Sequence, residues 1–361
     1  MEEIRKNDYC VILAGGMGRR LWPVSTESLP KQFIDFFGTG RTLLQQTYDR
    51  FAAFIPASRI FVSTYEGYVS LVKEQLPDLP AANILPEPVQ LNTAPAAVWC
   101  NWHAILADPA ANLVITPADQ LVQYADRFEE QVRHALRFVE THELFLALGA
   151  RPTMANTAYG YIQMGHPLDE SAGLYEVKSF SEKPQQGYAR AFMESGEFLW
   201  NTGIFLWNAR TMAAMLAGLA GRPYHDAEEV ARQMVTIEEE VDYVRSCFPG
   251  ELPRSIDLLI LDRCPNVAVK ECDFGWADIG CWTALHESCR QDADGNAVSG
   301  GGRVMFSGTS RSMVSLPEGM DAVICGLDNY LVAQKDGKLL ICPNTDPDLI
   351  RRLINEARFN E

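Results

Sequence analysis

The sequence lacks the uninterrupted run of about 18 apolar residues that a membrane-spanning helix requires. It is also short of positive charge, because 31 Lys and Arg stand against 47 Asp and Glu and give a formal net charge of −16. A general nucleic-acid binder needs a basic surface to displace the counterions of the phosphate backbone. We therefore expect a protein with no membrane-spanning helix and no nucleic-acid partner.

Paired cysteine motifs and an export signal are missing as well. None of the nine cysteines belongs to a C-x-x-C motif, and Cys264, Cys272, Cys281 and Cys289 are too widely spaced for a zinc knuckle. The first apolar stretch, Tyr9–Ala14, is too short for the hydrophobic region of a leader. These absences indicate reduced thiols and a cytoplasmic location.

The length of 361 residues and the 47% of hydrophobic residues indicate a folded protein with a large domain and a smaller one. Up to about residue 150, short β-rich apolar runs alternate with stretches of helical spacing. The runs are Tyr9–Ala14, Arg59–Thr64, Asn83–Leu85, Asn112–Thr116 and Leu144–Leu148. This alternation predicts an α/β fold with a mostly parallel central sheet, helices on both faces, and functional residues at the carboxyl ends of the strands.

The pattern changes twice further along the chain. From about residue 155 to 290, strand-like and helical segments mix, which we interpret as an extension of the same sheet. After Asp292, short β runs follow one another, and an amphipathic helix near Asp346–Phe359 comes last. The sequence therefore predicts a domain over residues 1–290 and a small β-rich domain over residues 291–361.

The first predicted strand runs directly into a glycine-rich loop. Gly15, Gly16 and Gly18 let the backbone approach a ligand and turn its N–H groups toward an anion. Arg19 and Arg20 add positive charge. The loop matches neither the P-loop nor the dinucleotide fingerprint, whose third glycine is replaced here by leucine. The pattern predicts a site for a polyphosphate, with a plain turn as the alternative.

Together with Pro30-Lys31-Gln32-Phe33, this loop resembles that of the mannose-1-phosphate guanylyltransferases. Seven further motifs occur downstream in the order that this family shows. They are Glu87-Pro88 with Asn92-Thr93-Ala94-Pro95-Ala96, Pro117-Ala118-Asp119, Tyr159-Gly160-Tyr161-Ile162, Glu182-Lys183-Pro184, Leu199-Trp200-Asn201-Thr202-Gly203-Ile204-Phe205, Ser255-Ile256-Asp257 and Phe274-Gly275-Trp276-Ala277-Asp278-Ile279-Gly280. The resemblance covers residues 9 to 290 and extends more loosely to the tail.

The resemblance implies transfer of GMP from GTP to mannose 1-phosphate, with release of pyrophosphate and formation of GDP-mannose. The nucleophile of this reaction is a phosphate oxygen, which is largely dianionic at neutral pH and needs no general base. The reaction instead needs relief of the repulsion between two anions and in-line alignment of the attacking and leaving oxygens. Cations in a fixed geometry would therefore carry the catalysis.

The resemblance assigns catalysis to two cations and two carboxylates. Arg20 and Lys31 contact the triphosphate in this interpretation, whereas an isolated Lys or Arg is more often a solvated surface group. Asp119 follows a predicted strand, and Asp278 lies far along the chain. With phosphate oxygens and water, two carboxylates make a hard oxygen site suited to Mg²⁺. The alternative for Asp119 is a helix cap.

The resemblance also implies two binding regions. The nucleotide-binding residues are Gly15, Gly16, Gly18, Arg19, Glu87, Asn92 and Thr93. The sugar-phosphate-binding residues are Gly160, Glu182, Lys183 and Asn201. Adjacent side chains of a strand point to opposite faces, so we expect Glu182 and Lys183 not to form a simple ion pair. The alternative for the segment around Asn201 is a turn between strands.

The residues alone do not identify the nucleotide base or the hexose of the substrates. Gln90-Leu91 stands where Gly-Arg is frequent in the family, so a related transferase with another base or hexose is one alternative. A catalytically silent sensor of nucleotide sugars is another, although it would be expected to have lost one of the four catalytic residues.

The tail differs from that of longer family members, which add an isomerase barrel with a histidine-bound metal. No His follows His286, and only about 70 residues follow Asp292, so we expect a single activity. The tail resembles the C-terminal β domain of the short members, which has left-handed β-helical character and helps to form dimers. We therefore expect a homodimer.

Overall fold

The computed structural model describes residues 6–219, 236–247, 255–262, 264, 266–344 and 349–357. The chain forms two compact units. The first comprises residues 1–15, 48–117 and 122–276, and the second comprises 16–47, 118–121 and 277–361. Both units are built from segments that alternate along the chain, and the predicted domain boundary at residue 290 stays a prediction.

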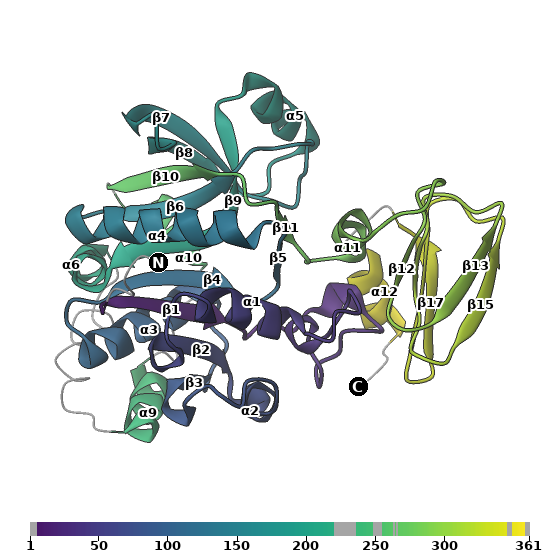
Figure 1. The fold of residues 1–361 in the computed structure, drawn as a ribbon, viewed down its shortest axis with the longest axis horizontal. Helices are drawn as coiled ribbons and strands as arrows, with labels where there is room; N and C mark the ends of the chain where they lie inside the picture. The colour runs from purple at the N-terminus through teal and green to yellow at the C-terminus, as the bar shows by residue number, and fades with distance from the viewer. Residues whose placement is uncertain are drawn as a thin grey trace. The chain divides into compact units, whose positions relative to one another are not determined.

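The first unit contains a nine-stranded sheet with the order β3-β2-β1-β4-β9-β6-β10-β8-β7 (Figure 1). Its strands are β1 (Asp8–Leu13), β2 (Ile60–Tyr65), β3 (Ile84–Glu87), β4 (Asn112–Pro117), β6 (Phe145–Ala150), β7 (Tyr161–Asp169), β8 (Leu174–Ser181), β9 (Phe198–Asn208) and β10 (Val267–Cys272). The α/β fold predicted from the sequence is confirmed.

The sheet is mixed. Strands β1 to β4 pair in parallel, as do β6 and β10, whereas β9 runs antiparallel to β4 and to β6. Strands β7 and β8 also pair antiparallel. The parallel strands β1, β2 and β4 are apolar and buried over almost their whole length, whereas the antiparallel strand β8 carries exposed polar residues. Strand β9 is antiparallel although it is largely buried, so composition alone does not set its direction.

Helices cover both faces of this sheet. Tyr9 and Val11 of β1 share a core with Ala97 of α3, whereas Cys10 and Ile12, which point to the opposite face, are equally buried. Helix α4 contacts β4, β6 and β9. The α-helices of the chain are α1 (Leu43–Ala52), α2 (Val69–Gln75), α3 (Thr93–Ala107), α4 (Ala125–Thr141), α5 (Gln186–Ser195), α6 (Ala209–Leu219), α9 (Ile237–Cys247), α10 (Ile256–Leu261), α11 (Trp282–Ser288) and α12 (Leu349–Ala357).

Short elements complete the chain. The 3-10 helices are η1 (Arg19–Leu21), η2 (Lys31–Phe33), η3 (Ala57–Arg59), η4 (Glu66–Tyr68) and η5 (Ala81–Asn83). Strands β5 (Gln120–Val122) and β11 (Trp276–Asp278) pair in a two-stranded sheet, which the sequence analysis did not predict.

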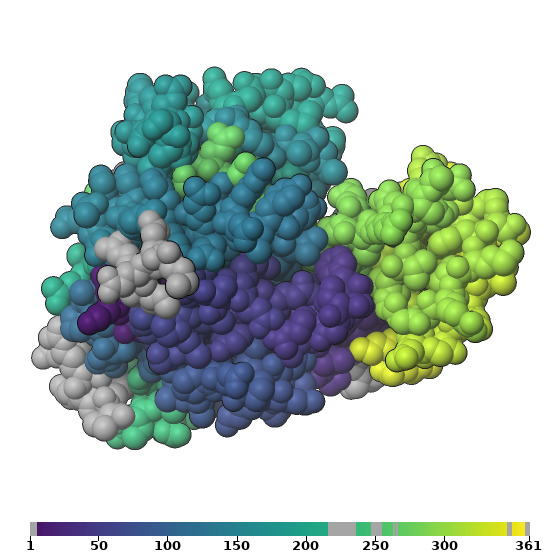
Figure 2. Space-filling model, viewed as in Figure 1, coloured from purple at the N-terminus to yellow at the C-terminus, as the bar shows by residue number. Residues whose placement is uncertain are grey.

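The C-terminal strands of the second unit pair in parallel, except that β17 runs antiparallel to β16. They are β12 (Ala297–Ser299), β13 (Arg303–Ser307), β14 (Met313–Ser315), β15 (Asp321–Cys325), β16 (Tyr330–Lys335) and β17 (Lys338–Pro343). Arg303 pairs with Asp321 and Met313 pairs with Leu331, each 18 positions along the chain. Ala297 pairs with Met313, 16 positions along the chain. These similar offsets are typical of a chain wound in coils, and the left-handed sense stays a prediction. Figure 2 shows the surface of these strands in green to yellow.

One core joins these coils to the segment that follows β1. Leu21, Trp22 and Phe36 are buried in the same cluster as Met313 and Leu331. Two hydrogen bonds to backbone carbonyls add to this core, from Trp282 Nε1 to Trp22 at 3.1 Å and from Ser299 Oγ to Phe36 at 2.8 Å. The second unit therefore buries residues from the early and the late parts of the sequence in one interior.

The described residues bear on two expectations, which concern membrane-spanning helices and free cysteines. None of the described helices is long and apolar enough to cross a membrane. The cysteines whose side chains are described are all free thiols, as the sequence predicts.

Candidate active site

Ten of the fifteen predicted site residues lie in three clusters, one in the second unit and two in the first. We call them the Lys31 cluster, the Glu87 cluster and the Asn201 cluster. The Lys31 cluster contains Arg20, Lys31, Asp119 and Asp278; the Glu87 cluster contains Gly15, Ser63, Glu87 and Gln90; the Asn201 cluster contains Gly160, Glu182, Lys183, Asn201 and Asp257.

The glycine loop fixes the place of Lys31. Gln32, which is buried, donates from Nε2 to Gly16 O at 2.9 Å and so ties η2 to the loop. Gly18 has a φ of +62°, and a Cβ at this position would lie 2.6 Å from Ser25 Oγ and 3.0 Å from Lys31 Cγ. Only glycine combines this backbone conformation with the close approach of the lysine stem.

Lys31 is held by carboxylates of its own unit. Its Nζ lies 2.6 Å from Asp119 Oδ2 and donates to Ile279 O at 3.1 Å. The side chains of Lys31 and Asp119 are only 12% and 21% exposed. Burial alone would lower the pKa of Lys31, but Asp119 and Asp278 more than offset this effect, so the pKa is raised and the ammonium stays charged.

Two carboxylates from distant motifs thus act on one ammonium. Asp119 follows β4, and Asp278 ends β11 directly before Ile279, whose N–H donates to Asp119 O at 3.2 Å. A Cβ on Gly280 would lie 2.8 Å from Asp278 Oδ2, so glycine leaves this carboxylate room. The convergence expected of the two motifs is present, and their role as metal ligands stays a prediction.

The donor set fits Mg²⁺. Within the described residues, no three His, Cys, Asp or Glu side chains come together as a metal site. Two carboxylates alone suit Mg²⁺, which usually keeps several waters and is bound through one or two carboxylates plus substrate phosphates. Lys31 Nζ lies beside Asp119 Oδ2, so the protein already places one positive charge next to this carboxylate.

The two arginines of the loop differ in their surroundings. Arg19 is exposed, and its guanidinium forms an ion pair at the surface, from Nη2 to Glu27 Oε1. Arg20 is partly buried. Burial raises the pKa of Cys281, Asp278 raises it further, and Arg20 opposes them, which places Arg20 within electrostatic range of the residues that follow β11. A phosphate role for Arg19 stays a prediction.

The Glu87 cluster places a carboxyl group beside the first glycine of the loop. Ser63 Oγ donates to Glu87 Oε1 at 2.7 Å, and a Cβ on Gly15 would lie 3.3 Å from the same oxygen. Gln90 Nε2 donates to Gly15 O at 3.0 Å. Burial raises the pKa of Glu87 to about 7, against the hydrogen bond from Ser63, which lowers it.

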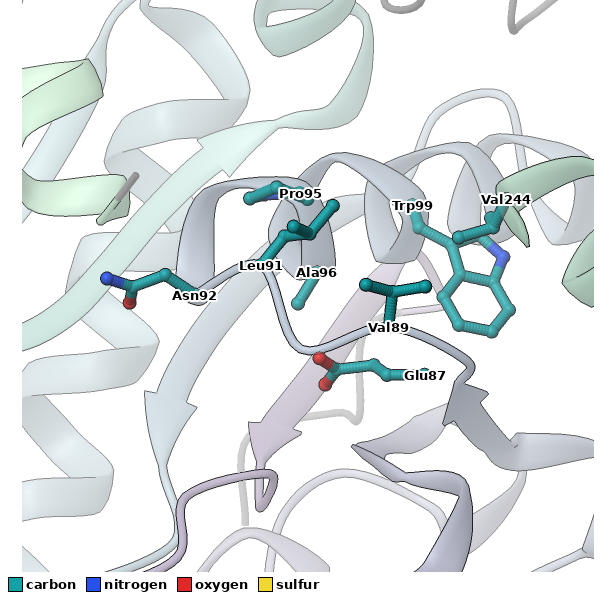
Figure 3. A pocket seen from close by; sticks show the side chains of 8 residues that line it. All are labelled: Glu87, Val89, Leu91, Asn92, Pro95, Ala96, Trp99 and Val244. Atoms are coloured by element: carbon teal, nitrogen blue, oxygen red, sulfur yellow. The ribbon is translucent and has the colours of Figure 1, made fainter. Parts of the chain in front are cut away.

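An apolar pocket adjoins Glu87 along the segment between β3 and α3 (Figure 3). Glu87 and Asn92 supply its polar groups. Its other lining residues are Val89, Leu91, Pro95, Ala96, Trp99 and Val244. The pocket has a volume of only about 10 Å³, which is room for a single water molecule.

Asn92 and Thr93 begin α3 and already have partners inside the protein. Asn92 caps the helix with a φ of +73°, and its Oδ1 accepts from Thr93 N at 2.8 Å. Thr93 Oγ1 accepts from Ile256 N at 2.9 Å. Their predicted contact with a nucleotide stays a prediction.

A bulge in β9 orients Asn201. The register of β6 against β9 shifts between Ala147 and Gly149, opposite the segment that contains Asn201. Asn201 N donates to Gly160 O at 2.8 Å, and Gly203 N donates to Asn201 Oδ1 at 3.0 Å. The alternative of a turn between strands is wrong, because Asn201 lies inside β9.

Glu182 and Lys183 form an ion pair, contrary to the prediction. Strand β8 ends at Ser181, before these residues, and Lys183 has a φ of +46°. The alternation that would separate neighbouring side chains therefore does not apply here. Gly160 is needed beside this pair, because a Cβ there would lie 2.9 Å from Glu182 Oε2 and 2.8 Å from Phe180 Cε2.

Comparison with known proteins shows to which family this chain belongs. Residues 9–295 match the model of the nucleotidyl transferase family. The chain belongs to that family.

The relatives of this nucleotidyl transferase are similar over most of its length. A mannose-1-phosphate guanylyltransferase of Escherichia coli is 32% identical over 91% of this chain and 71% of its own, and one of Klebsiella pneumoniae is 32% identical over 97% and 74%. A crystal structure from Thermus thermophilus, named as a mannose-1-phosphate geranyltransferase, has a TM-score of 0.85 and 28% identity, covering 98% of this chain and 99% of that one.

Two residues of this nucleotidyl transferase were missed as site residues. The sequence shows Gln90 only as a departure from the family pattern. The three-dimensional structure is needed to see that its side chain contacts Gly15. Asp257 lies in a recognised motif without an assigned role, and its Oδ1 accepts from Asn201 Nδ2 at 2.6 Å. Burial raises the pKa of Asp257, and the hydrogen bond from Asn201 opposes this shift.

Proposed function

We propose that this nucleotidyl transferase moves GMP from GTP to mannose 1-phosphate, giving GDP-mannose and pyrophosphate with the help of Mg²⁺. The observation that carries the proposal is the Lys31 cluster, where one buried ammonium is shared by two carboxylates from distant motifs. The names of the relatives support the choice of sugar phosphate and base.

In this proposal the cations neutralise the triphosphate. Lys31 is charged at neutral pH because its pKa is raised, and its position is fixed before any substrate binds. A charge that needs no rearrangement stabilises the developing negative charge more effectively than water does. Lys31 would keep its contacts with Asp119 and Ile279 and point its third N–H at a phosphate oxygen, and Arg20 would contact the departing pyrophosphate.

Asp119 and Asp278 would hold Mg²⁺, with phosphate oxygens and water completing its coordination. When bound, the ion withdraws negative charge from the phosphate oxygens and so weakens the repulsion of the incoming sugar phosphate. The two carboxylates also keep Lys31 protonated and in place, which the protein achieves with its own residues.

Glu87 would select guanine. An ionised carboxylate accepts hydrogen bonds at both oxygens, and guanine presents two neighbouring donors, N1–H and the N2 amino group, on one edge. Adenine presents an acceptor at N1 and would leave the carboxylate without a donor there.

The Asn201 cluster would bind mannose 1-phosphate. Glu182 would accept hydrogen bonds from hexose hydroxyl groups, and Lys183 would bind the sugar's phosphate. Their side chains are 32% and 54% exposed, so the ion pair between them opens at little cost when a substrate enters. Asn201 and the backbone of Gly160 would complete the pocket.

We also propose that the chain forms a homodimer through its coils. Met305 and Val323 pair directly on β13 and β15 and are 62% and 67% exposed. Two neighbouring exposed apolar side chains are typical of an association surface. Met305→Glu would then yield a monomer, detected as a halved molar mass by light scattering, whereas an unchanged mass would refute this surface.

One assay tests the reaction. The pure protein would be mixed with Mg²⁺, each nucleoside triphosphate in turn, and either mannose or glucose 1-phosphate, and pyrophosphate release would be recorded. We expect turnover with GTP and mannose 1-phosphate and none after chelation of the metal. Preference for another base or hexose would indicate a related transferase, and binding of GDP-mannose without turnover would indicate a sensor.

A further inference from the structure

Helix α10 contacts one residue of each predicted binding region of the first unit. At its first position, the Ile256 backbone N–H donates to Thr93 Oγ1 at 2.9 Å. At its second position, Asp257 Oδ1 accepts from Asn201 Nδ2 at 2.6 Å. Thr93 is assigned to the nucleotide and Asn201 to the sugar phosphate. Two consecutive residues of one helix therefore bridge these regions.

Helix α10 is held firmly in place, by a capping side chain and by buried residues. Ser255 caps it, since its Oγ accepts from Leu258 N at 3.2 Å. Ile256 and Ile260 are buried in the same core cluster as Ala97 of α3, the helix that Thr93 begins. A close-packed core resists small independent shifts, so α10 and the start of α3 move together.

The side chain of Asn201 has one orientation that satisfies both of its neighbours. The backbone N–H of Gly203 can only donate, so it faces Oδ1, and Asp257 Oδ1 accepts from Nδ2 at the other end of the amide. Without Asp257, the amide would lose the contact that fixes its nitrogen end.

We propose that α10 couples the two substrates, so that a nucleotide bound at Thr93 favours the position of Asn201 that receives the sugar phosphate, with Asp257 as the positioning residue. This inference rests on the proposed function of the two regions. Linkage is reciprocal, so each ligand raises the affinity of the other by the same factor.

Calorimetric titration tests the coupling without turnover. The protein would be titrated with mannose 1-phosphate alone and with saturating α,β-methylene GTP, in which the bond that breaks is replaced by a stable one. We expect about fivefold tighter binding or more with the analogue, the lower end of typical couplings. Thr93→Val and Asp257→Ala would remove this gain.

Matched variants separate coupling from stability. Thr93→Ser keeps the hydroxyl and would keep the gain. Thr309→Val removes another buried hydroxyl, which donates to Ile324 O at 3.1 Å in the coils, and would also keep it. Asp257→Asn keeps the shape and an acceptor oxygen for Asn201 Nδ2, so it would keep most of the gain, and Thr93→Val carries the test if Asp257→Ala does not fold.

Each outcome has one meaning. Wild-type protein that binds both ligands without coupling, or a folded Thr93→Val protein with full coupling, overturns the inference and leaves the proposed function standing. Coupling seen only with a different nucleotide or hexose phosphate, and lost in Thr93→Val, supports the inference and refutes the proposed substrates.

Discussion

Two lysine–carboxylate pairs of this chain have the same chemistry and opposite surroundings. Lys31 and Asp119 come from distant parts of the sequence, and their side chains are 12% and 21% exposed. Lys183 and Glu182 are neighbours in the sequence, and their side chains are 54% and 32% exposed. The fold builds the first pair, whereas a local turn builds the second, so the first is a fixed part of the site and the second opens easily.

The largest effect is expected from the fixed pair. Lys31→Met removes the charge and keeps most of the stem, and we expect kcat to fall by about 100-fold or more, as when one oxyanion donor is lost. Steady-state kinetics would measure this. Lys73→Met, at an exposed lysine of α2, is the control. A rise in KM with unchanged kcat would show that Lys31 serves binding alone.

The next effect concerns the metal. Asp278→Asn is expected to raise the Mg²⁺ concentration for half-maximal rate by about tenfold or more. Removing even a residue that only hydrogen-bonds a metal ligand typically lowers metal affinity by about tenfold or more. Asp273→Asn, which removes an exposed carboxylate bound to Arg127, should leave this concentration unchanged. An identical Mg²⁺ dependence in both variants would remove Asp278 from the metal site.

The exposed pair is expected to act on binding. Glu182→Gln should raise KM for mannose 1-phosphate by about tenfold, since a hydrogen bond to a charged group contributes about 1.5–3 kcal/mol. The free energy of unfolding should change by less than about 1 kcal/mol, because surface pairs contribute little. Urea denaturation measures the second quantity, and a larger loss would show that the pair is structural.

The smallest effect extends the comparison to Glu87, whose partner is a hydroxyl rather than a cation. Its pKa of about 7 means that the carboxylate form needed for guanine increases as pH rises from 6 to 8, so KM for GTP should fall several-fold over this range. Glu87→Gln should abolish this pH dependence. A pH profile that is the same in the variant would exclude Glu87 as its source.

The same raised pKa predicts a stability effect of opposite sign. The folded protein holds the Glu87 proton more tightly than the unfolded chain, whose value is near 4.5. Folding stability of the ligand-free protein therefore declines as pH rises from about 4.5 toward 7, and Glu87→Gln should flatten this decline. Thermal unfolding across this pH range would measure it.

Sequence reasoning succeeded where a strand end fixes the side chain. Asp119 follows a strand of near-continuous apolar residues, and its convergence with Asp278 was expected from the motifs. Its contact with Lys31 was not predicted. Strands as short as β5 and β11 carry no periodicity, so they could not be predicted. The antiparallel pairing of β9 also depends on the order of strands in space, which local pattern does not contain.

The missed contacts share a physical cause. The ion pair of Glu182 and Lys183 depends on a positive φ that non-glycine residues seldom adopt and that no local residue pattern announces. The hydrogen bonds of Asp257 to Asn201 and of Gln90 to Gly15 join residues more than 50 positions apart. Side-chain partners at such separations are set by packing, and a single sequence shows only the residue types.

If Arg20 and Lys31 act as proposed, the shared interior of the second unit connects the coils to turnover. Residues that flank Arg20 and Lys31, such as Trp22 and Phe36, are buried against Met313 and Leu331 of the coils. A shortened protein that ended before residue 291 would lose the inner wall against which the catalytic segment is shaped. Engineering that trims or replaces this tail should therefore be judged first by its effect on kcat and only then by its effect on assembly.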